Sequence, residues 1–78
     1  MERQQVRSSN IRSIGYDSEQ HILEVEFRNG GLYQYFDVPA ERHIGLMQAP
    51  SHGRYLDRCI KGRYRYRKIW AHHGPAGW

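Results

Sequence analysis

The stretch of sequence that decides the fold reads Ile22-Leu23-Glu24-Val25-Glu26-Phe27-Arg28-Asn29-Gly30-Gly31-Leu32-Tyr33-Gln34-Tyr35-Phe36. Its first part alternates apolar and polar side chains with period two, which is typical of a strand with one buried face. Asn29-Gly30 is the preferred sequence of a two-residue type I′ turn, and apolar and aromatic residues return after it. We therefore predict an antiparallel hairpin that turns at Asn29-Gly30.

A two-residue turn also fixes which residues of the hairpin face each other. The predicted pairs are Arg28 with Gly31, Phe27 with Leu32, Val25 with Gln34, and Leu23 with Phe36. The apolar members of these pairs would form the core face, together with Gln34. The opposite face would carry Glu24 and Glu26 across from Tyr35 and Tyr33, so the central Tyr-x-Tyr pair is expected beside two carboxylates.

The residues before the hairpin predict one more strand. Residues 1–5 are expected to be a disordered lead-in, and residues 6–10 continue it as a polar segment. Residues 11–16 have the composition of a short strand, and the turn-forming residues 17–20 close it. Together with the hairpin, this strand makes a three-stranded antiparallel meander.

Two short helices are predicted after the hairpin. Pro39 suits the first helical position and Pro50 ends the first helix. Ser51 can cap a second helix, which stops at Gly62. The predicted apolar faces comprise Ala40, His43, Ile44 and Met47 on the first helix, and Tyr55, Leu56, Cys59 and Ile60 on the second. The opposite side of the second helix carries a basic ridge of Arg54, Arg58 and Lys61.

The end of the chain combines an alternating segment with an irregular one. Arg63-Tyr64-Arg65-Tyr66-Arg67 suits an extended strand with arginine on one side and tyrosine on the other. Residues 71–78 contain glycine and proline without a period and are expected to be a flexible tail. The predicted fold is a small single α+β domain over residues 6–70, with a three-stranded meander, two short helices and a C-terminal extended segment that could add to the sheet.

The composition limits the classes of protein to consider. Apolar residues make up 38% and charged residues 26% of the 78 residues, so the core is expected to be thin. The one cysteine, Cys59, cannot form an intramolecular disulfide, and no apolar run approaches a membrane span or a signal peptide. We therefore expect a cytoplasmic protein without a membrane partner.

Positive charge is concentrated near the C-terminus. Residues 1–50 carry five basic and seven acidic side chains, a net −2, whereas residues 51–78 carry seven basic side chains and one acidic, a net +6. Arginine alternating with tyrosine offers donors to phosphate beside rings that can stack on bases. These residues predict binding of RNA, as tRNA or a single strand, or of another polyanion. The candidate binding residues are Arg54, Arg58, Lys61, Arg63, Tyr64, Arg65, Tyr66, Arg67 and Lys68.

Two other interpretations use the same residues. In the first, the arginines at 63–67 cross the sheet, neutralise Glu24 and Glu26, and sandwich the tyrosine rings, so that Tyr33 and Tyr35 are structural rather than stacking platforms. In the second, an unpaired sheet edge or the aromatic C-terminal strand binds another protein or a second copy of the chain.

Neither a metal site nor catalysis is predicted. His21, His43, His52 and Cys59 lack the paired spacing of metal ligands. Cys59 shares an apolar face and is a poor nucleophile there. Glu24 and Glu26 would lie on an open sheet rather than in a cleft, so we expect no enzyme activity, cofactor or metal.

The ordered motifs of this chain resemble the KTSC domain family. The motifs are Ser8-Ser9-Asn10-Ile11, Ile14-Gly15-Tyr16-Asp17, Tyr33-x-Tyr35, Ser51-x-Gly53-x-Tyr55 and Ile60-x-Gly62-x-Tyr64-x-Tyr66. The family is found at the C-terminus of some lysyl-tRNA synthetases and as small stand-alone bacterial proteins. The resemblance covers about residues 6–69 and implies no established activity; the attachment to a synthetase suggests RNA binding. Tyr33 and Tyr35 match the family's central Tyr-x-Tyr motif.

Overall fold

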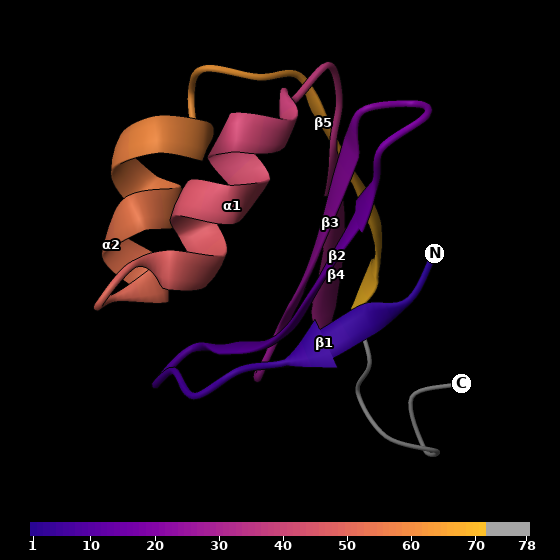
Figure 1. Ribbon diagram of the computed structural model, residues 1–78. Coiled ribbons are helices and arrows are strands. Elements are labelled where there is room, and N and C mark those ends of the chain that lie inside the picture. The colour runs from indigo at the N-terminus through magenta and orange to yellow at the C-terminus, as the bar shows by residue number, and fades with distance from the viewer. Residues whose placement is uncertain (72–78) are drawn as a thin grey trace.

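The computed structural model describes the backbone of residues 1–71 and the side chains of residues 1–69. The predicted flexible tail therefore lies outside the described residues, except for the backbone of Ala71. The strands are β1 (Arg3–Gln5), β2 (Ile11–Asp17), β3 (Ile22–Phe27), β4 (Gly31–Tyr35) and β5 (Tyr66–Ala71). The helices are α1 (Ala40–Gln48), α2 (His52–Tyr55) and a π-helical turn, η1 (Leu56–Ile60). The strands form one antiparallel sheet in the order β1-β2-β3-β4-β5, and the helices cover one of its faces (Figure 1).

The predicted α+β class is confirmed, but the sheet has five strands rather than three. Strand β1 forms within the expected lead-in, where no apolar side chain signals a strand; its backbone pairs with residues 13–15 of β2. The C-terminal segment does add to the sheet, but β5 begins at Tyr66 and not at Arg63. Gly62, at φ 78°, and a hydrogen bond from the Arg63 amide to the Ile60 carbonyl (3.1 Å) form a turn there instead.

The hairpin is present, but its predicted register is wrong by one residue. Leu23 pairs with Tyr35 and Val25 with Tyr33, whereas Glu24 pairs with Gln34. The cause is a three-residue loop: the Gly30 amide donates to the Phe27 carbonyl at 3.0 Å, and Gly30 has a φ of 99°. Because strand faces alternate, this shift moves both tyrosines onto the core face and leaves Gln34 with the glutamates.

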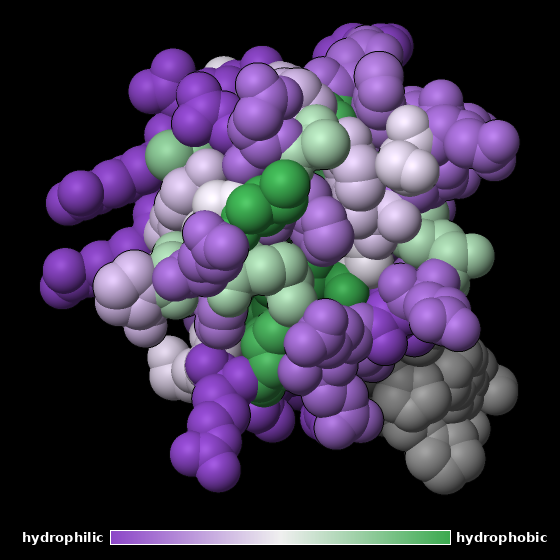
Figure 2. Space-filling model, in the orientation of Figure 1, coloured by the Kyte–Doolittle hydropathy of each residue, from purple (hydrophilic) through white to green (hydrophobic). Residues whose placement is uncertain are grey.

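The core lies between the sheet and the helices. Its buried residues are Ile11, Ile14, Leu23, Val25, Tyr35, Val38, Leu46, Leu56 and Ile60. On α1 the predicted apolar face is partly wrong, because Ile44 is 52% exposed and Leu46 is buried in its place. Hydrophilic side chains cover most of the face seen in Figure 2, with a small group of apolar side chains over the helices.

The second helix agrees with its predicted cap and stripe. The Ser51 hydroxyl accepts from the Arg54 amide, and Leu56 and Ile60 are buried. The π-helical turn was not predicted; it is closed by the Lys61 amide, which donates to the Leu56 carbonyl at 2.8 Å. Lys61 then leaves the helix in an extended conformation. Within residues 1–71, no helix is long and apolar enough to cross a membrane.

Candidate functional site

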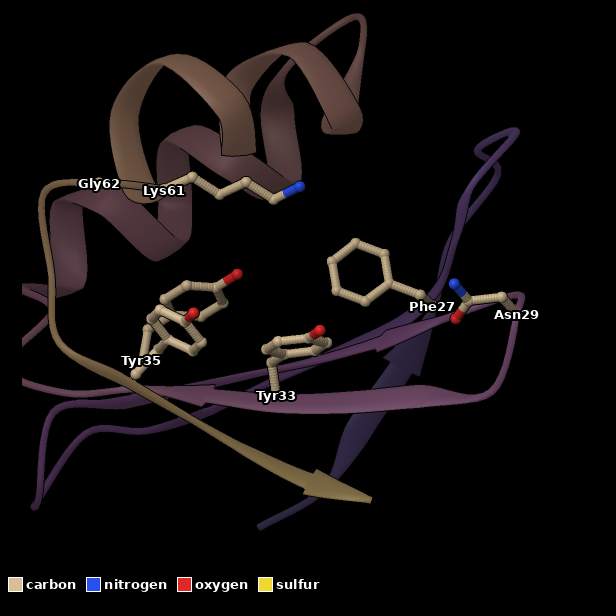
Figure 3. A pocket seen from close by; sticks show the side chains of 7 residues that line it. Phe27, Asn29, Tyr33, Tyr35, Lys61 and Gly62 are labelled. Atoms are coloured by element: carbon tan, nitrogen blue, oxygen red, sulfur yellow. The ribbon is translucent and has the colours of Figure 1, made fainter. Parts of the chain in front are cut away.

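A cavity lined by aromatic side chains opens beside the point where the chain leaves η1 for the sheet (Figure 3). It has a volume of about 440 Å³. Its lining consists of Phe27, Asn29, Tyr33, Tyr35, Lys61, Gly62 and Tyr66, and we refer to it as the aromatic cavity. Its walls come from the β3–β4 hairpin, from the segment after η1 and from β5, so the cavity exists only in the folded chain.

The rings of this cavity form one continuous cluster. Tyr33 and Tyr35 have nearly parallel rings, 19° apart, with centroids at 6.4 Å. Phe27 meets Tyr33 edge to face at 5.4 Å. Tyr66, which pairs with Tyr35 across the strands, lies 5.8 Å from Tyr33 and 5.9 Å from Tyr35. Because Tyr66 is 61% exposed, the cluster presents ring surface to solvent.

Two lysines place positive charge against these rings. The Lys61 ammonium lies 5.4 Å from the Phe27 centroid, and the Lys68 ammonium lies 5.9 Å from the Tyr33 centroid. Both distances fall within the range of cation–π attraction. Lys61 also pairs with Asp57 at 3.3 Å, but both side chains of this pair are about half exposed or more. The charge therefore remains accessible to a solvent-borne anion.

The polar groups of the aromatic cavity include several hydrogen-bond donors. Burial, and then the nearby phenols of Tyr33 and Tyr66, raise the pKa of Tyr35 to about 12, so its hydroxyl stays neutral and can donate. The Asn29 side-chain oxygen accepts from the Gly31 amide at 2.9 Å, which leaves its NH₂ group as a donor. The cavity thus combines apolar ring faces with donors at its edge.

A second hollow is more open than the aromatic cavity. It is lined by Phe36, Gly62, Arg63, Tyr64, Arg65, Tyr66 and Arg67, and we refer to it as the arginine hollow. Gly62 and Tyr66 line both spaces, so the two adjoin the same segment of chain. The ring cluster lies on the helix-facing side of the sheet, whereas Arg67, which pairs with Gln34, projects from the other side of β5, the edge strand.

Among the described side chains, the arginines of residues 63–67 form no salt bridge with Glu24 or Glu26. Glu24 accepts from Arg3 at 3.0 Å, and Glu26 accepts from the Ser13 hydroxyl at 2.9 Å. Arg65 pairs with Asp37 at 3.3 Å, with both side chains at least 78% exposed. Among the described side chains, no salt bridge involves Arg54, Arg58, Arg63, Arg67 or Lys68. The predicted neutralisation of Glu24 and Glu26 by the C-terminal arginines is therefore wrong.

The structure brings together only part of the predicted binding set. Tyr33, Tyr35, Lys61, Tyr66 and Lys68 meet at the aromatic cavity, while Arg63, Tyr64, Arg65 and Arg67 surround the arginine hollow. Arg54 and Arg58 are exposed on the helical segment and line neither space. The predicted ridge is also interrupted, because the Lys61 side chain crosses toward Phe27.

Sequence reasoning missed Phe27 and Asn29 as site residues. It placed Phe27 in the core and treated Asn29 as a turn residue only. The available signal was Gly30, which can take the left-handed conformation (φ 99°) that ends a three-residue loop and so sets the register that turns Tyr33 toward Phe27.

His21, His43, His52 and Cys59 do not line this site. His43 stacks on Tyr16 with centroids 4.8 Å apart, and burial lowers the pKa of His43. The His52 Nδ1 atom is 2.8 Å from the Leu46 carbonyl oxygen. Within the described residues, no group of three or more His, Cys, Asp or Glu side chains is arranged to hold a metal ion.

The comparisons with known proteins agree on one family. The KTSC domain profile matches residues 7–64. An uncharacterized protein of Stutzerimonas stutzeri is 49% identical over 70 residues, covering 88% of this chain and 99% of that protein. A lysine–tRNA ligase of Trichormus variabilis is 38% identical over 61 residues, which cover 78% of this chain but only 11% of the ligase. The crystal structure of a KTSC domain protein from Yersinia pestis matches with a TM-score of 0.86 and 49% identity, covering 88% of this chain and 97% of that one.

Proposed function

The chain belongs to the KTSC domain family, and from this premise and the geometry of its surface we propose that it binds RNA through residues 61–68. The observation that carries the proposal is that the aromatic cavity and the arginine hollow adjoin the same segment of chain, with Gly62 and Tyr66 lining both. Proteins that bind single-stranded nucleic acid use cationic side chains, which hold the phosphates, together with aromatic rings, which stack on the bases.

The charge distribution supports an anionic partner. Arg63, Arg67 and Lys68 are exposed and form no salt bridge with another described side chain. The two pairs that do involve this segment, Lys61–Asp57 and Arg65–Asp37, are solvent-exposed. An exposed pair contributes at most about 1 kcal/mol, so a phosphate can displace the carboxylate at little cost.

The relatives support RNA among the polyanions. The matched lysine–tRNA ligases carry a segment similar to this chain within a much longer protein whose name states that it acts with tRNA. The match covers only that segment, so it supports no ligase reaction for this chain. The role proposed for this chain is non-enzymatic binding, in the cytoplasm, where its unpaired Cys59 would stay reduced.

The proposal is tested by a salt series with the intact chain. Fluorescence anisotropy would measure its affinity for tRNA and for a scrambled single strand at increasing salt. We expect binding at low salt that weakens steadily as salt rises, because each phosphate contact releases counterions. Absence of binding at low salt with micromolar protein contradicts the proposal. A stable dimer in light scattering that is indifferent to RNA would instead favour the protein-interaction alternative.

A further inference from the structure

We infer that the aromatic cavity is a slot for one unpaired nucleobase, with the neighbouring phosphates held by Lys61, Lys68 and the arginine hollow. This inference rests on the proposed function and adds to it what the site selects: a base that is free of its partner strand. Phosphate contacts alone would not favour the single strand, because a duplex presents phosphates at even higher density.

The shape of the cavity suits a flat ring. Tyr33 is half-buried and Tyr66 is 61% exposed, so these two rings offer surface to the space, while Phe27 meets Tyr33 at 90° and forms a side wall (Figure 3). The volume of about 440 Å³ lies at the low end of small-molecule sites, which leaves room for one nucleotide. A base can therefore lie on the tyrosine faces with one edge toward Phe27.

The donors at the cavity suit the acceptor atoms of a base. The Lys61 ammonium, the free NH₂ of Asn29 and the neutral Tyr35 hydroxyl all line the same space. Base edges present carbonyl oxygens and ring nitrogens, which accept from such groups once base pairing no longer occupies them. A paired base has those atoms engaged and is also stacked on both sides.

The surroundings provide the path for the rest of the strand. Tyr66 lines both the aromatic cavity and the arginine hollow, and β5 is the edge strand, so a strand that leaves the slot past Tyr66 can turn around this edge to the arginines of residues 63–67. Lys68 lies against Tyr33, and Lys61 lies against Phe27. Both ammonium groups therefore place positive charge at the slot, where they can hold the phosphates of a bound nucleotide.

The test compares a single strand with a blunt duplex of the same length, using the intact chain. The probe is a short RNA carrying 2-aminopurine at alternate positions, whose fluorescence falls when the base stacks on an aromatic ring. The variants are Tyr66→Thr and Tyr33→Leu. Tyr66 is 61% exposed, so its replacement keeps the test valid even if the Tyr33 variant unfolds. Ile44→Thr, at a 52% exposed position on α1, is the matched control.

We expect the wild-type chain to quench 2-aminopurine in the single strand and to bind the duplex more weakly. Tyr66→Thr should weaken single-strand binding roughly tenfold, as base–aromatic stacking predicts, while Ile44→Thr should not. Equal affinity for strand and duplex, with no quenching and no effect of Tyr66→Thr, would overturn the base slot and leave RNA binding through charge intact. If the wild-type chain binds no RNA at all, the proposed function itself is refuted.

Discussion

The Arg3 guanidinium donates to the Glu24 carboxylate at 3.0 Å by reaching over Gly15, the residue of β2 that lies between them in the sheet. Gln34 donates to the other oxygen of the same carboxylate at 2.9 Å. Both oxygens of the Glu24 carboxylate therefore accept hydrogen bonds from within the sheet, one from β1 and one from β4. This arrangement leaves the cations of residues 63–68 available to outside molecules.

Replacing Glu24 with Gln tests this arrangement. The variant removes the charge that holds Arg3, so we expect a loss of about 1–3 kcal/mol in the free energy of unfolding. RNA affinity should not fall, because no arginine of residues 63–67 depends on Glu24. Denaturant unfolding and fluorescence anisotropy measure the two quantities. A large drop in RNA affinity in a folded variant would show that the carboxylate orders the binding surface.

Gly15→Ala should also destabilise the first strand. A Cβ atom at this position would lie 2.8 Å from Arg3 Cγ and 2.9 Å from the Glu2 carbonyl oxygen. Because one of these neighbours is backbone, β1 must shift, and we expect a loss of about 1–3 kcal/mol. Hydrogen exchange should show reduced protection of the residues in β1. Unchanged stability and protection would contradict the close approach of these strands.

Gly45 packs against Tyr55 between the helices, and at this position the steric cost of a side chain opposes the usual preference of a helix for alanine. A Cβ atom at Gly45 would meet the Tyr55 hydroxyl, and would lie 2.7 Å from Cζ of that ring. Alanine normally stabilises a helix interior by about 0.5–1 kcal/mol relative to glycine. We nevertheless expect Gly45→Ala to lower the midpoint of denaturant unfolding. In a double-mutant cycle with Tyr55→Leu the cost should largely disappear; a persisting cost would contradict this contact.

The raised pKa of Tyr35 predicts that the folded chain loses stability at alkaline pH. Its pKa is about 12 in the folded chain, above the ordinary value of 10.0, because burial disfavours the phenolate. The neutral form therefore favours folding, and its contribution is complete below pH 10 and is lost as the pH rises toward 12. Tyr35→Phe should remove this part of the alkaline destabilisation. Ultraviolet titration of the phenols measures it, and a Tyr35 titration near 10 in the folded chain would contradict the assignment.

Asp57→Asn should strengthen RNA binding. The carboxylate pairs with Lys61 at 3.3 Å on an exposed helix surface, an i, i+4 pair that contributes about 0.3–0.5 kcal/mol to stability. Removing its charge frees Lys61 at the aromatic cavity and takes a negative charge away from the phosphates. We expect a small change in the unfolding midpoint and a several-fold gain in affinity. Weaker binding by the folded variant would indicate that Asp57 positions Lys61 for the ligand.

The alternation in residues 22–27 was sufficient to predict the hairpin, and the apolar stripe with the Ser51 cap was sufficient for the second helix. The register could not be predicted, because Asn29-Gly30 suits both a two-residue loop and a three-residue loop that ends in a left-handed glycine. Strand β1 consists of Arg3, Gln4 and Gln5, which carry no apolar period, so only pairing with β2 defines it.

The cationic residues of the candidate site followed from composition, but their grouping did not. The register decides that Tyr33 and Tyr35 face Phe27 instead of the glutamates. The turn at Gly62 and the π-helical turn before it decide that Lys61 reaches Phe27. These features arise from tertiary packing and backbone conformation, which local patterns specify poorly.

The most direct test of the account is the salt dependence of RNA binding by a variant with Arg63, Arg65 and Arg67 all replaced by Gln. Its control is Arg12→Gln, an exposed arginine on β2. If these arginines contact phosphates, the slope of log affinity against log salt should fall by roughly 2 for the triple variant, since each single-strand phosphate contributes about 0.7. The control should lose little or nothing. Equal slopes for the triple variant, the control and the wild-type chain would contradict the claim that this surface binds nucleic acid.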